Sequence, residues 1–304
     1  MDNRTEIREF LASRRAKITP EVAGLTLFGG RRRVPGLRRE EVAMLAGVSV
    51  DYYTKLERGN LAGTSESVLD AIARALNLDQ AEREHLYNLA RASGPASKTQ
   101  RRPLQSGAVR PALQFMLDSM TGAPAFIGNH HMDIVAANQL AYALYSEMYR
   151  RPARPANHSR FIFLDPKARE FYPNWELAAD TNVAILRTQS GRNPLDKRLS
   201  DLVAELSMRS GEFRSRWAAH NVRRHYAGTK VFRHPVVGEL ELFYEAMELA
   251  EDPGFTLTVY PALPGSPSDE RLRLLASWAA TERIQDIARA PQGQAMPGRE
   301  ESRP

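Results

Sequence analysis

Basic side chains gather around one short segment of the sequence, residues 37–59, LRREEVAMLAGVSVDYYTKLERG. Arg38 and Arg39 lie at its start, Lys55 lies near its end, and an arginine triplet at 31–33 precedes it. Guanidinium and ammonium groups donate hydrogen bonds to phosphate oxygens and, where their spacing allows, to acceptors on base edges. The segment therefore has the side chains to bind a polyanion, and its fold must decide how they are presented.

The spacing within 37–59 predicts two short helices joined by a glycine turn. Val42 faces inward on the first helix, Gly47 can adopt the positive φ of the turn, and Ser49 is a good N-cap for the second helix. Tyr53 and Leu56 then face inward, three residues apart. This pattern is typical of a helix-turn-helix, whose second helix enters the major groove of DNA. Paired amphipathic helices also occur in ordinary helical cores, so spacing alone leaves both interpretations open.

The outer face of the second helix favours DNA. Val50, Asp51, Tyr52 and Lys55 are expected to face outward, and they form no apolar stripe on which another protein layer would pack. The basic residues that flank this face are Arg31, Arg32, Arg33, Arg38 and Arg39. Lys55 can donate to guanine, and Asp51 can accept from cytosine. Asp51 would also stabilise the helix dipole without any DNA, and the triplet at 31–33 could be only a solvated loop.

Charge and composition restrict the remaining functions. Residues 1–104 carry 18 Lys and Arg against 13 Asp and Glu, whereas residues 105–304 carry 24 against 23. The excess of positive charge in the first third indicates a polyanionic partner there. The chain has no cysteine, which excludes disulfides and thiolate metal sites. It has no apolar run of about 18 residues and no secretory signal, so we expect a cytoplasmic protein that does not enter membranes.

The first part of the chain is expected to be helical. We predict a helix-turn-helix domain over 1–92, in which Thr19 and Pro20 start a further helix and 29–36, GGRRRVPG, forms a basic loop. Asp79 and Glu82 form the pattern of a capping box. Residues 93–107 have the Ser, Gly and Pro content of a linker, and 288–304 have the composition of a disordered tail.

Residues 108–287 have a different pattern, typical of an α+β domain. A helix is expected over 110–121, followed by a strand, a turn, a strand and a helix in APAFIGNHHMDIVAANQLAYALY. Near-alternating apolar residues in KVFRHPVVGELELFYEAMEL and GFTLTVYPAL predict strands of an antiparallel sheet. Helices are expected around 165–190, 195–208 and 211–219, with a final helix over 268–289. The fold class is therefore multidomain, all-α followed by α+β.

Residues 37–59 resemble the helix-turn-helix of phage-repressor-like (Cro-type) regulators, the XRE family. Together with FLASRRAKITPE, LDAIARAL and EREHLYNLA they resemble more closely the bacterial MmyB-like subgroup. FIFLDPKAREFYPNWE, ELSMRSGEFRSRWAAHNVR and GTKVFRHPVVGELELFYE extend that resemblance through the second part. The resemblance implies a PAS-like ligand-binding domain behind a DNA-binding head. It also implies that Val50, Asp51, Tyr52 and Lys55 occupy base-approaching positions; we add Ser49 to the predicted DNA-binding residues.

The chain departs from the family pattern at three places. Arg39 stands where the family usually has a glutamine, so the amide contact cannot be carried over. A phosphate contact is expected there, with a base contact as the alternative. Arg38 replaces the usual short Ser or Thr cap before it. After the hairpin, LAGTSES replaces a proline-containing loop, which puts that loop's backbone contact in doubt.

Candidate ligand-binding residues in the second domain are aromatic or histidine side chains near the expected sheet. They are Tyr142, Trp217, His220, Phe232 and His234. A pocket of this kind would enclose an apolar ligand fixed by one or two polar groups. The alternative is that the aromatic residues form the core and the histidines are structural.

No metal or cofactor is expected. His130 and His131 are adjacent, and adjacent residues of a regular strand point to opposite faces, so they could not readily share one metal ion. One of them could still bind a haem iron. We find no pairing of nucleophile and base, and no glycine-rich phosphate loop.

The leading hypothesis is a one-component transcription regulator, not an enzyme. We expect it to bind a pseudo-palindromic operator in double-stranded DNA as a homodimer, through a recognition helix at 49–58. Its second domain would bind a small, mainly apolar ligand that could be acyl-chain-like. The alternatives are an enzyme with its active site in 108–287, whose head serves targeting or dimerisation, and an adaptor whose head binds another protein.

Overall fold

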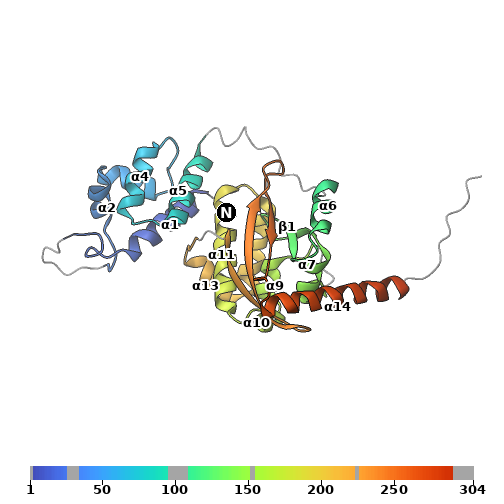
Figure 1. Cartoon of the computed structure of the whole chain (residues 1–304). Helices are drawn as coiled ribbons and strands as arrows, with labels where there is room; N and C mark the ends of the chain where they lie inside the picture. Colours follow the sequence, from blue (N-terminus) through green and yellow to red (C-terminus); the bar gives the residue numbers. More distant parts are fainter. Residues whose placement is uncertain (1–2, 26–33, 95–108, 151–154, 223–225, 290–304) are drawn as a thin grey trace, which may run out of the picture.

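The computed structural model describes residues 3–25, 34–94, 109–150, 155–222 and 226–289 (Figure 1). Its helices are α1 (Asn3–Lys17), α2 (Arg39–Ala46), α3 (Val50–Glu57), α4 (Glu66–Ala75), α5 (Gln80–Ser93), α6 (Pro111–Ser119), α7 (Gln139–Leu144), α8 (Ser146–Tyr149), α9 (His158–Leu164), α10 (Lys167–Phe171), α11 (Trp175–Arg192), α12 (Lys197–Arg209), α13 (Gly211–Ala218) and α14 (Pro267–Arg289). Its strands are β1 (Ala125–Asn129), β2 (Ile134–Ala137), β3 (Ala227–His234), β4 (Gly238–Glu248) and β5 (Phe255–Val259).

The helices α1 to α5 form an N-terminal head around one apolar core. α2 and α3 form the predicted hairpin: Gly47 has φ +66°, and the Ser49 hydroxyl accepts from the Tyr52 N–H at 3.1 Å. Tyr53 and Leu56 are buried in the core, as predicted from their spacing. The predicted capping box of α5 is confirmed, because Asp79 accepts from the Glu82 N–H at 2.9 Å and the Glu82 carboxylate accepts from the Asp79 N–H at 3.1 Å.

The helix predicted to begin at Thr19 and Pro20 is wrong within the described residues. The structure has a turn there, in which the Ala23 N–H donates to the Thr19 carbonyl and the Leu25 N–H to the Pro20 carbonyl. Gly24 follows with φ +72°, a conformation that ends a helical turn. Thr19 and Pro20 therefore begin a single helical turn, and the positive φ of Gly24 ends it.

The second domain contains a five-stranded antiparallel sheet in the order β2-β1-β5-β4-β3. Alternation along β1 divides its side chains between two layers: Phe126 packs on one face with residues of α7, α9 and α10, and Ala125 and Ile127 pack on the other with Leu113 and Leu117 of α6. The predicted helical head and α+β domain with an antiparallel sheet are confirmed. A PAS-like relationship stays an expectation.

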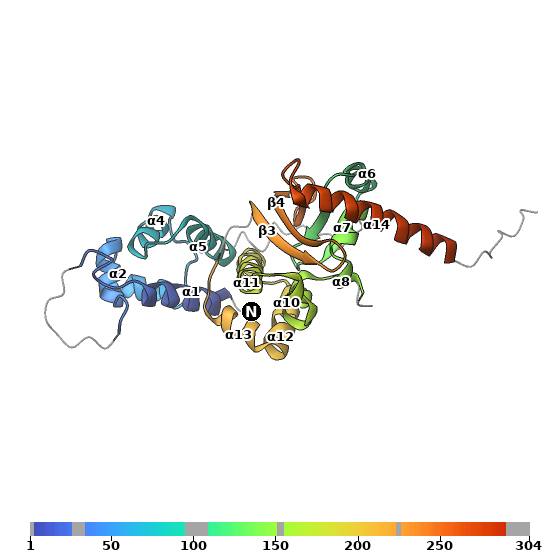
Figure 2. The same cartoon turned by 60° about the horizontal axis from the view of Figure 1, so that its bottom comes forward.

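The helix predicted over 165–190 is two helices. α10 ends at Phe171 and α11 begins at Trp175, with Asn174 as its N-cap. Pro173 separates them, because a proline disfavours helical geometry in the residue before it. α11 then lies between the head and the sheet (Figures 1 and 2) and packs against α5 of the head.

The predicted domain limits, 1–92 and 108–287, stay predictions. The predicted linker at 93–107 and tail at 288–304 lie mostly outside the described residues, although α5 includes Ser93 and α14 continues to Arg289. Leu272 and Leu275 of α14 pack in the core of the domain, and the C-terminal part of this helix extends away from the domain in both views (Figures 1 and 2). Within the described part of the chain, no helix is both long enough and apolar enough to cross a bilayer.

Candidate DNA interface and ligand pocket

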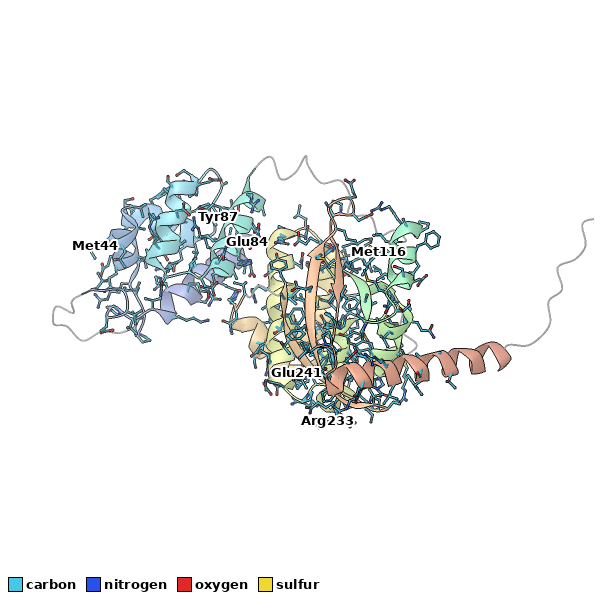
Figure 3. All side chains as sticks on the ribbon, in the orientation of Figure 1. Met44, Glu84, Tyr87, Met116, Arg233 and Glu241 are labelled. Atoms are coloured by element: carbon cyan, nitrogen blue, oxygen red, sulfur yellow. The ribbon has the colours of Figure 1, made fainter. Side chains whose placement is uncertain are left out.

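The outer face of α3 has the composition and exposure that base contacts require. Asp51 and Lys55 are exposed, Val50 is 46% exposed, and Tyr52 is partly buried. Figure 3 shows the side chains of this part of the head, with the exposed Met44 labelled on the neighbouring α2. Since Tyr53 and Leu56 anchor the inner face, the outer side chains are held on a fixed helix.

Arg39 has a structural partner as well as an exposed surface. Its guanidinium pairs with the buried carboxylate of Glu57 on α3, and Arg15 of α1 pairs with the other oxygen of that carboxylate at 2.7 Å. Arg15 also donates to the Leu37 carbonyl at 2.9 Å. The Arg39 side chain remains 53% exposed. The residue that replaces the usual glutamine thus ties α2 to α3 and still leaves part of its guanidinium toward solvent.

The other predicted DNA contacts surround the same hairpin. Arg38 is exposed at the start of α2, where the Glu41 side chain accepts from its N–H at 2.6 Å in place of a Ser or Thr cap. Ser49 is exposed and uses its oxygen as an acceptor in the cap of α3, which leaves its hydroxyl proton for an external acceptor. Arg31, Arg32 and Arg33 lie outside the described residues.

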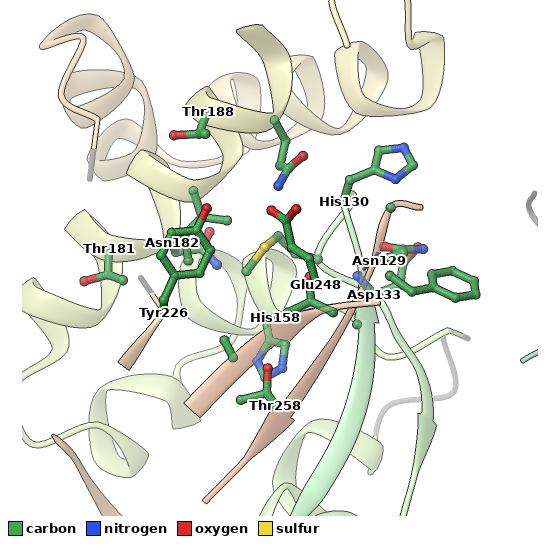
Figure 4. A pocket seen from close by; sticks show the side chains of 18 of the residues that line it. Asn129, His130, Asp133, His158, Thr181, Asn182, Thr188, Tyr226, Glu248 and Thr258 are labelled. Atoms are coloured by element: carbon green, nitrogen blue, oxygen red, sulfur yellow. Dashed lines mark hydrogen bonds between the residues drawn. The ribbon is translucent and has the colours of Figure 1, made fainter. Parts of the chain in front are cut away.

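A cavity of about 340 Å³, here called the central pocket, is lined by residues of the sheet, α11 and the head. Figure 4 shows side chains of its wall, among them Asn182 and Glu248. Its wall includes Phe126 of β1, Ile162 of α9 and Ile185 of α11, which are apolar. Two head residues, Ala81 and Glu84 of α5, also belong to the wall. A molecule bound here would therefore touch both domains.

Two polar groups in the central pocket have unused bonding capacity. The Asn182 side chain on α11 is buried, and its Oδ1 has no hydrogen-bond partner among the described residues. Lys230 of β3 is partly buried, with its Nζ 4.9 Å from the ring centre of Tyr172 and 5.5 Å from that of Phe232. Burial lowers the pKa of Lys230 to about 8, and no carboxylate contributes to that shift. The pocket thus offers a cation and an amide oxygen to a ligand.

None of the five residues predicted to bind ligand is among the described residues in the wall of the central pocket. Phe232 is fully buried in an aromatic core, and Trp217 is stacked on Phe213. His234 Nε2 lies 3.0 Å from the Ala143 carbonyl. His220 Nε2 lies 3.2 Å from the carboxylate of Glu9 in the head. Tyr142 is 45% exposed and lines a separate surface hollow with Tyr149 and Trp278. The structure thus places four of the five in the core or at the interface between domains.

Sequence reasoning missed Lys230, Asn182 and the whole contribution of α11 to the pocket. Lys230 is a charged residue in β3, and the sequence pattern predicts that its side chain faces solvent. The one available signal was its position two residues before Phe232, on the same face of the strand as a core aromatic.

A buried polar cluster joins the head to the second domain. Arg187 of α11 is fully buried and pairs with the buried Glu6 of α1. Its guanidinium also lies 2.9 Å from His220 Nδ1 and stacks over the Trp217 ring at 4.1 Å. Burial alone would raise the pKa of Glu6, but contacts with His220, His85 and Arg187 lower it well below its usual range. Glu6 is therefore charged, and its charge is balanced across the domain interface.

A second polar link is formed by residues of the pocket wall. Arg192, at the end of α11, contacts Glu84 of the head at 3.1 Å and Glu248 of β4 at 2.7 Å. All three residues also line the pocket. α11 thus contributes to the pocket wall and to both polar links with the head.

The geometric reason given against a shared ligand at His130 and His131 is wrong. Both residues lie in the turn between β1 and β2 rather than within a strand, so their side chains need not alternate. Their Nε2 atoms lie 2.7 and 3.0 Å from the same oxygen, Oδ2 of Asp196. Burial would raise the pKa of Asp196, but the Leu199 N–H and the two histidines lower it to about 2.

A helix-turn-helix hairpin joined to an α+β domain that contains a pocket is the layout of a helix-turn-helix regulator with a ligand-binding domain. Family comparison agrees: residues 8–86 match a helix-turn-helix domain, and residues 109–275 match the MmyB-like transcription regulator ligand binding domain. The chain belongs to the MmyB-like family of helix-turn-helix transcription regulators. No curated protein matches it in a sequence comparison.

Proposed function

We propose that this DNA-binding transcription regulator responds to a small anionic ligand with an apolar body, bound in the central pocket. The observation that carries the proposal is Lys230, whose ammonium group lies beside the rings of Tyr172 and Phe232 in a pocket wall that mixes apolar and polar side chains. Burial is the cause of its lowered pKa, and no carboxylate contributes to that shift. A cation without a counterion in such a place costs free energy unless a ligand's anion pairs with it. A carboxylate with an acyl chain has the required chemistry, with Asn182 available to accept from a hydroxyl or a protonated group.

Sequence-specific binding would use the outer face of α3. In this proposal Lys55, Asp51 and Tyr52 approach base edges, and Val50 packs on a thymine methyl group. Arg38, Arg39, Ser49 and the triplet at 31–33 would hold phosphates. One recognition helix reads few base pairs, so two copies of the chain would read a pseudo-palindromic operator.

Coupling between ligand and DNA would pass through α11. A ligand in the central pocket contacts the same helix whose Arg187 and Arg192 hold the head, and it contacts Ala81 and Glu84 directly. If the ligand binds one arrangement of the two domains better than another, it shifts the population of arrangements, and DNA affinity changes with it. Reciprocity requires DNA to change ligand affinity by the same factor.

The DNA half of the proposal is tested with an operator selected from random duplexes. Fluorescence anisotropy should give an affinity that falls steeply between about 50 and 200 mM salt, because bound phosphates release counterions. The absence of duplex binding, or binding that salt does not change, would refute a DNA-binding head.

The ligand half is tested by native mass spectrometry of the purified chain, before and after denaturation. We expect twice the chain mass before denaturation and release of an anionic, largely apolar molecule after it. Added dodecanoate should compete with that molecule, and dodecanol should compete more weakly because it has no charge to pair with Lys230. If a panel of metabolites is instead converted to products, residues 108–287 form an enzyme and the sensor proposal fails.

A further inference from the structure

The geometry points to a binding site for one divalent transition-metal ion of the zinc class, formed by His130, His131 and Asp196. The two histidines come from the turn between β1 and β2, and the aspartate is the N-cap of α12. Their potential ligand atoms all lie within 4.8 Å of one another. Lys230 and the predicted DNA-binding residues are not among its ligands, so its metal affinity can be measured without DNA or an organic ligand.

The distances from the aspartate oxygen to the two histidine nitrogens are close to those of a zinc coordination sphere. Zinc bonds to imidazole nitrogen and carboxylate oxygen are about 2.0–2.2 Å long, so two ligand atoms at tetrahedral positions lie about 3.3 Å apart. The Nε2 atoms of His130 and His131 lie 2.7 and 3.0 Å from Asp196 Oδ2. An outward shift of roughly half an ångström in the carboxylate would admit the ion, which is within ordinary side-chain motion.

The surrounding hydrogen bonds hold the three residues in place. Asn129 Oδ1 accepts from the His131 N–H at 2.9 Å, and Asn157 Nδ2 donates to the His131 carbonyl at 2.8 Å. On the other side, Asp196 Oδ1 accepts from the Leu199 N–H at 3.0 Å, which leaves Oδ2 directed at the histidines. Such outer contacts orient metal ligands and raise the affinity for the ion, because the ligand side chains lose little conformational freedom on binding.

The donor set selects among cations. Two imidazoles and one carboxylate suit zinc, copper, nickel or iron, whereas magnesium and calcium prefer oxygen alone. Arg198 lies nearby and opposes a cation, but its guanidinium is 3.7 Å from the buried carboxylate of Asp133, which offsets that charge. Three protein ligands leave a coordination position for water or an exogenous ligand. His130 also belongs to the wall of the central pocket.

Calorimetric titration of the chelator-treated full chain with zinc chloride tests the site. We expect saturation at one ion per chain, and a loss of affinity of at least about tenfold in Asp196→Asn and in His131→Gln. Asparagine caps helices as well as aspartate does, so Asp196→Asn removes the anionic ligand while keeping the N-cap. Asp201→Asn changes an exposed acid on the same helix and should bind zinc as the unchanged chain does.

Thermal unfolding without metal accompanies the titration. The melting temperatures of Asp196→Asn and Asp201→Asn should stay close to that of the unchanged chain, and zinc should raise the melting temperature of the unchanged chain and of Asp201→Asn only. The inference is overturned if the unchanged chain takes up no zinc, or if Asp196→Asn binds it as tightly as Asp201→Asn does. If His131→Gln does not fold, the comparison of the two aspartate variants still decides the question.

Discussion

The two proposed recognition surfaces of this chain hold their cations in opposite ways. Lys55 on α3 is exposed and solvated, whereas Lys230 in the central pocket is partly buried against aromatic rings. A solvated cation gains free energy on binding mainly when counterions leave the DNA, so its affinity depends on salt. A desolvated cation has already lost water, and an anion that reaches it is screened less. One chain can therefore have a salt-controlled site and a salt-tolerant site.

Arg187→Met should have the largest effect, because it removes the buried ion pair that joins α11 of the second domain to α1 of the head. The substitution leaves the Glu6 carboxylate buried without its cation, and we expect a loss of about 3–5 kcal/mol in the free energy of unfolding, measured with urea. Adding Glu6→Gln should recover most of that loss. Arg209→Met is the matched control, because Arg209 is exposed and pairs with Glu205 on the same helix, and its loss should cost about 1 kcal/mol or less.

The same variants show whether the buried pair carries coupling. In the Arg187→Met/Glu6→Gln chain, which should be folded, we expect ligand to change operator affinity less than it does in the unchanged chain. Equal coupling in both would assign the signal to Arg192 and Glu84 or to direct contact with α5.

Lys230→Met tests whether the buried ammonium group binds the anion of the ligand. We expect the affinity for dodecanoate to fall by about 1.5–3 kcal/mol, since a charge-assisted hydrogen bond is lost, while operator affinity without ligand stays unchanged. Lys230→Arg keeps the charge and should retain most of the affinity. Displacement of a fluorescent fatty acid by dodecanoate measures the affinity of each variant. An unchanged affinity in Lys230→Met would place the anion elsewhere.

The Lys230 pKa adds a pH dependence. Below about pH 8 the ammonium is charged and should bind the carboxylate, and affinity should fall as pH rises through 8. Stability should change in the other direction: the folded chain releases this proton near pH 8 and the unfolded chain near 10.5, so unfolding takes up a proton in that window and stability rises with pH. Lys230→Met should abolish both effects.

The head could be predicted from the sequence to a greater extent than the pocket because its elements are built from local spacing. Gly47, Ser49 and Leu56 act within one hairpin, so their roles follow from neighbours a few residues away. Turn signals were less informative at Thr19, because a cap and a proline start a turn without specifying its length. The family resemblance supplied the class of the second domain, but not its site.

The central pocket joins segments that are far apart in the sequence, and no local pattern records their meeting. Ala81, Asn182 and Lys230 come from α5, α11 and β3. Aromatic residues were favoured as ligand contacts, yet Phe232 and Trp217 lie in cores, where large rings bury the most apolar area. His130, His131 and Asp196 show the same limitation, since a turn places side chains in directions that strand alternation does not predict.

On the exposed surface, Lys55→Ala and Arg39→Ala should have different effects on DNA binding. Loss of Lys55 should cost about 1–3 kcal/mol at one base position and relax the preference there. Loss of Arg39 should weaken all sequences alike and reduce the salt dependence; Arg15 still pairs with Glu57, so the hairpin should remain folded. Anisotropy with the selected operator and a scrambled duplex separates the two patterns. Equal losses on both duplexes for both variants would refute the division of roles.

The smallest expected effect isolates one charge at the start of α3. Ser49→Asn and Ser49→Asp both keep an oxygen that can accept from the Tyr52 N–H, so the two variants should unfold at nearly the same urea concentration. They differ by one negative charge, which would lie near a phosphate if Ser49 contacts DNA. A screened pair of like charges at about 4 Å costs about 1 kcal/mol, so only Ser49→Asp should lose several-fold in operator affinity, and the loss should shrink as salt is added. If both variants bind alike at low salt, Ser49 is only a helix cap, and the DNA interface begins at Val50.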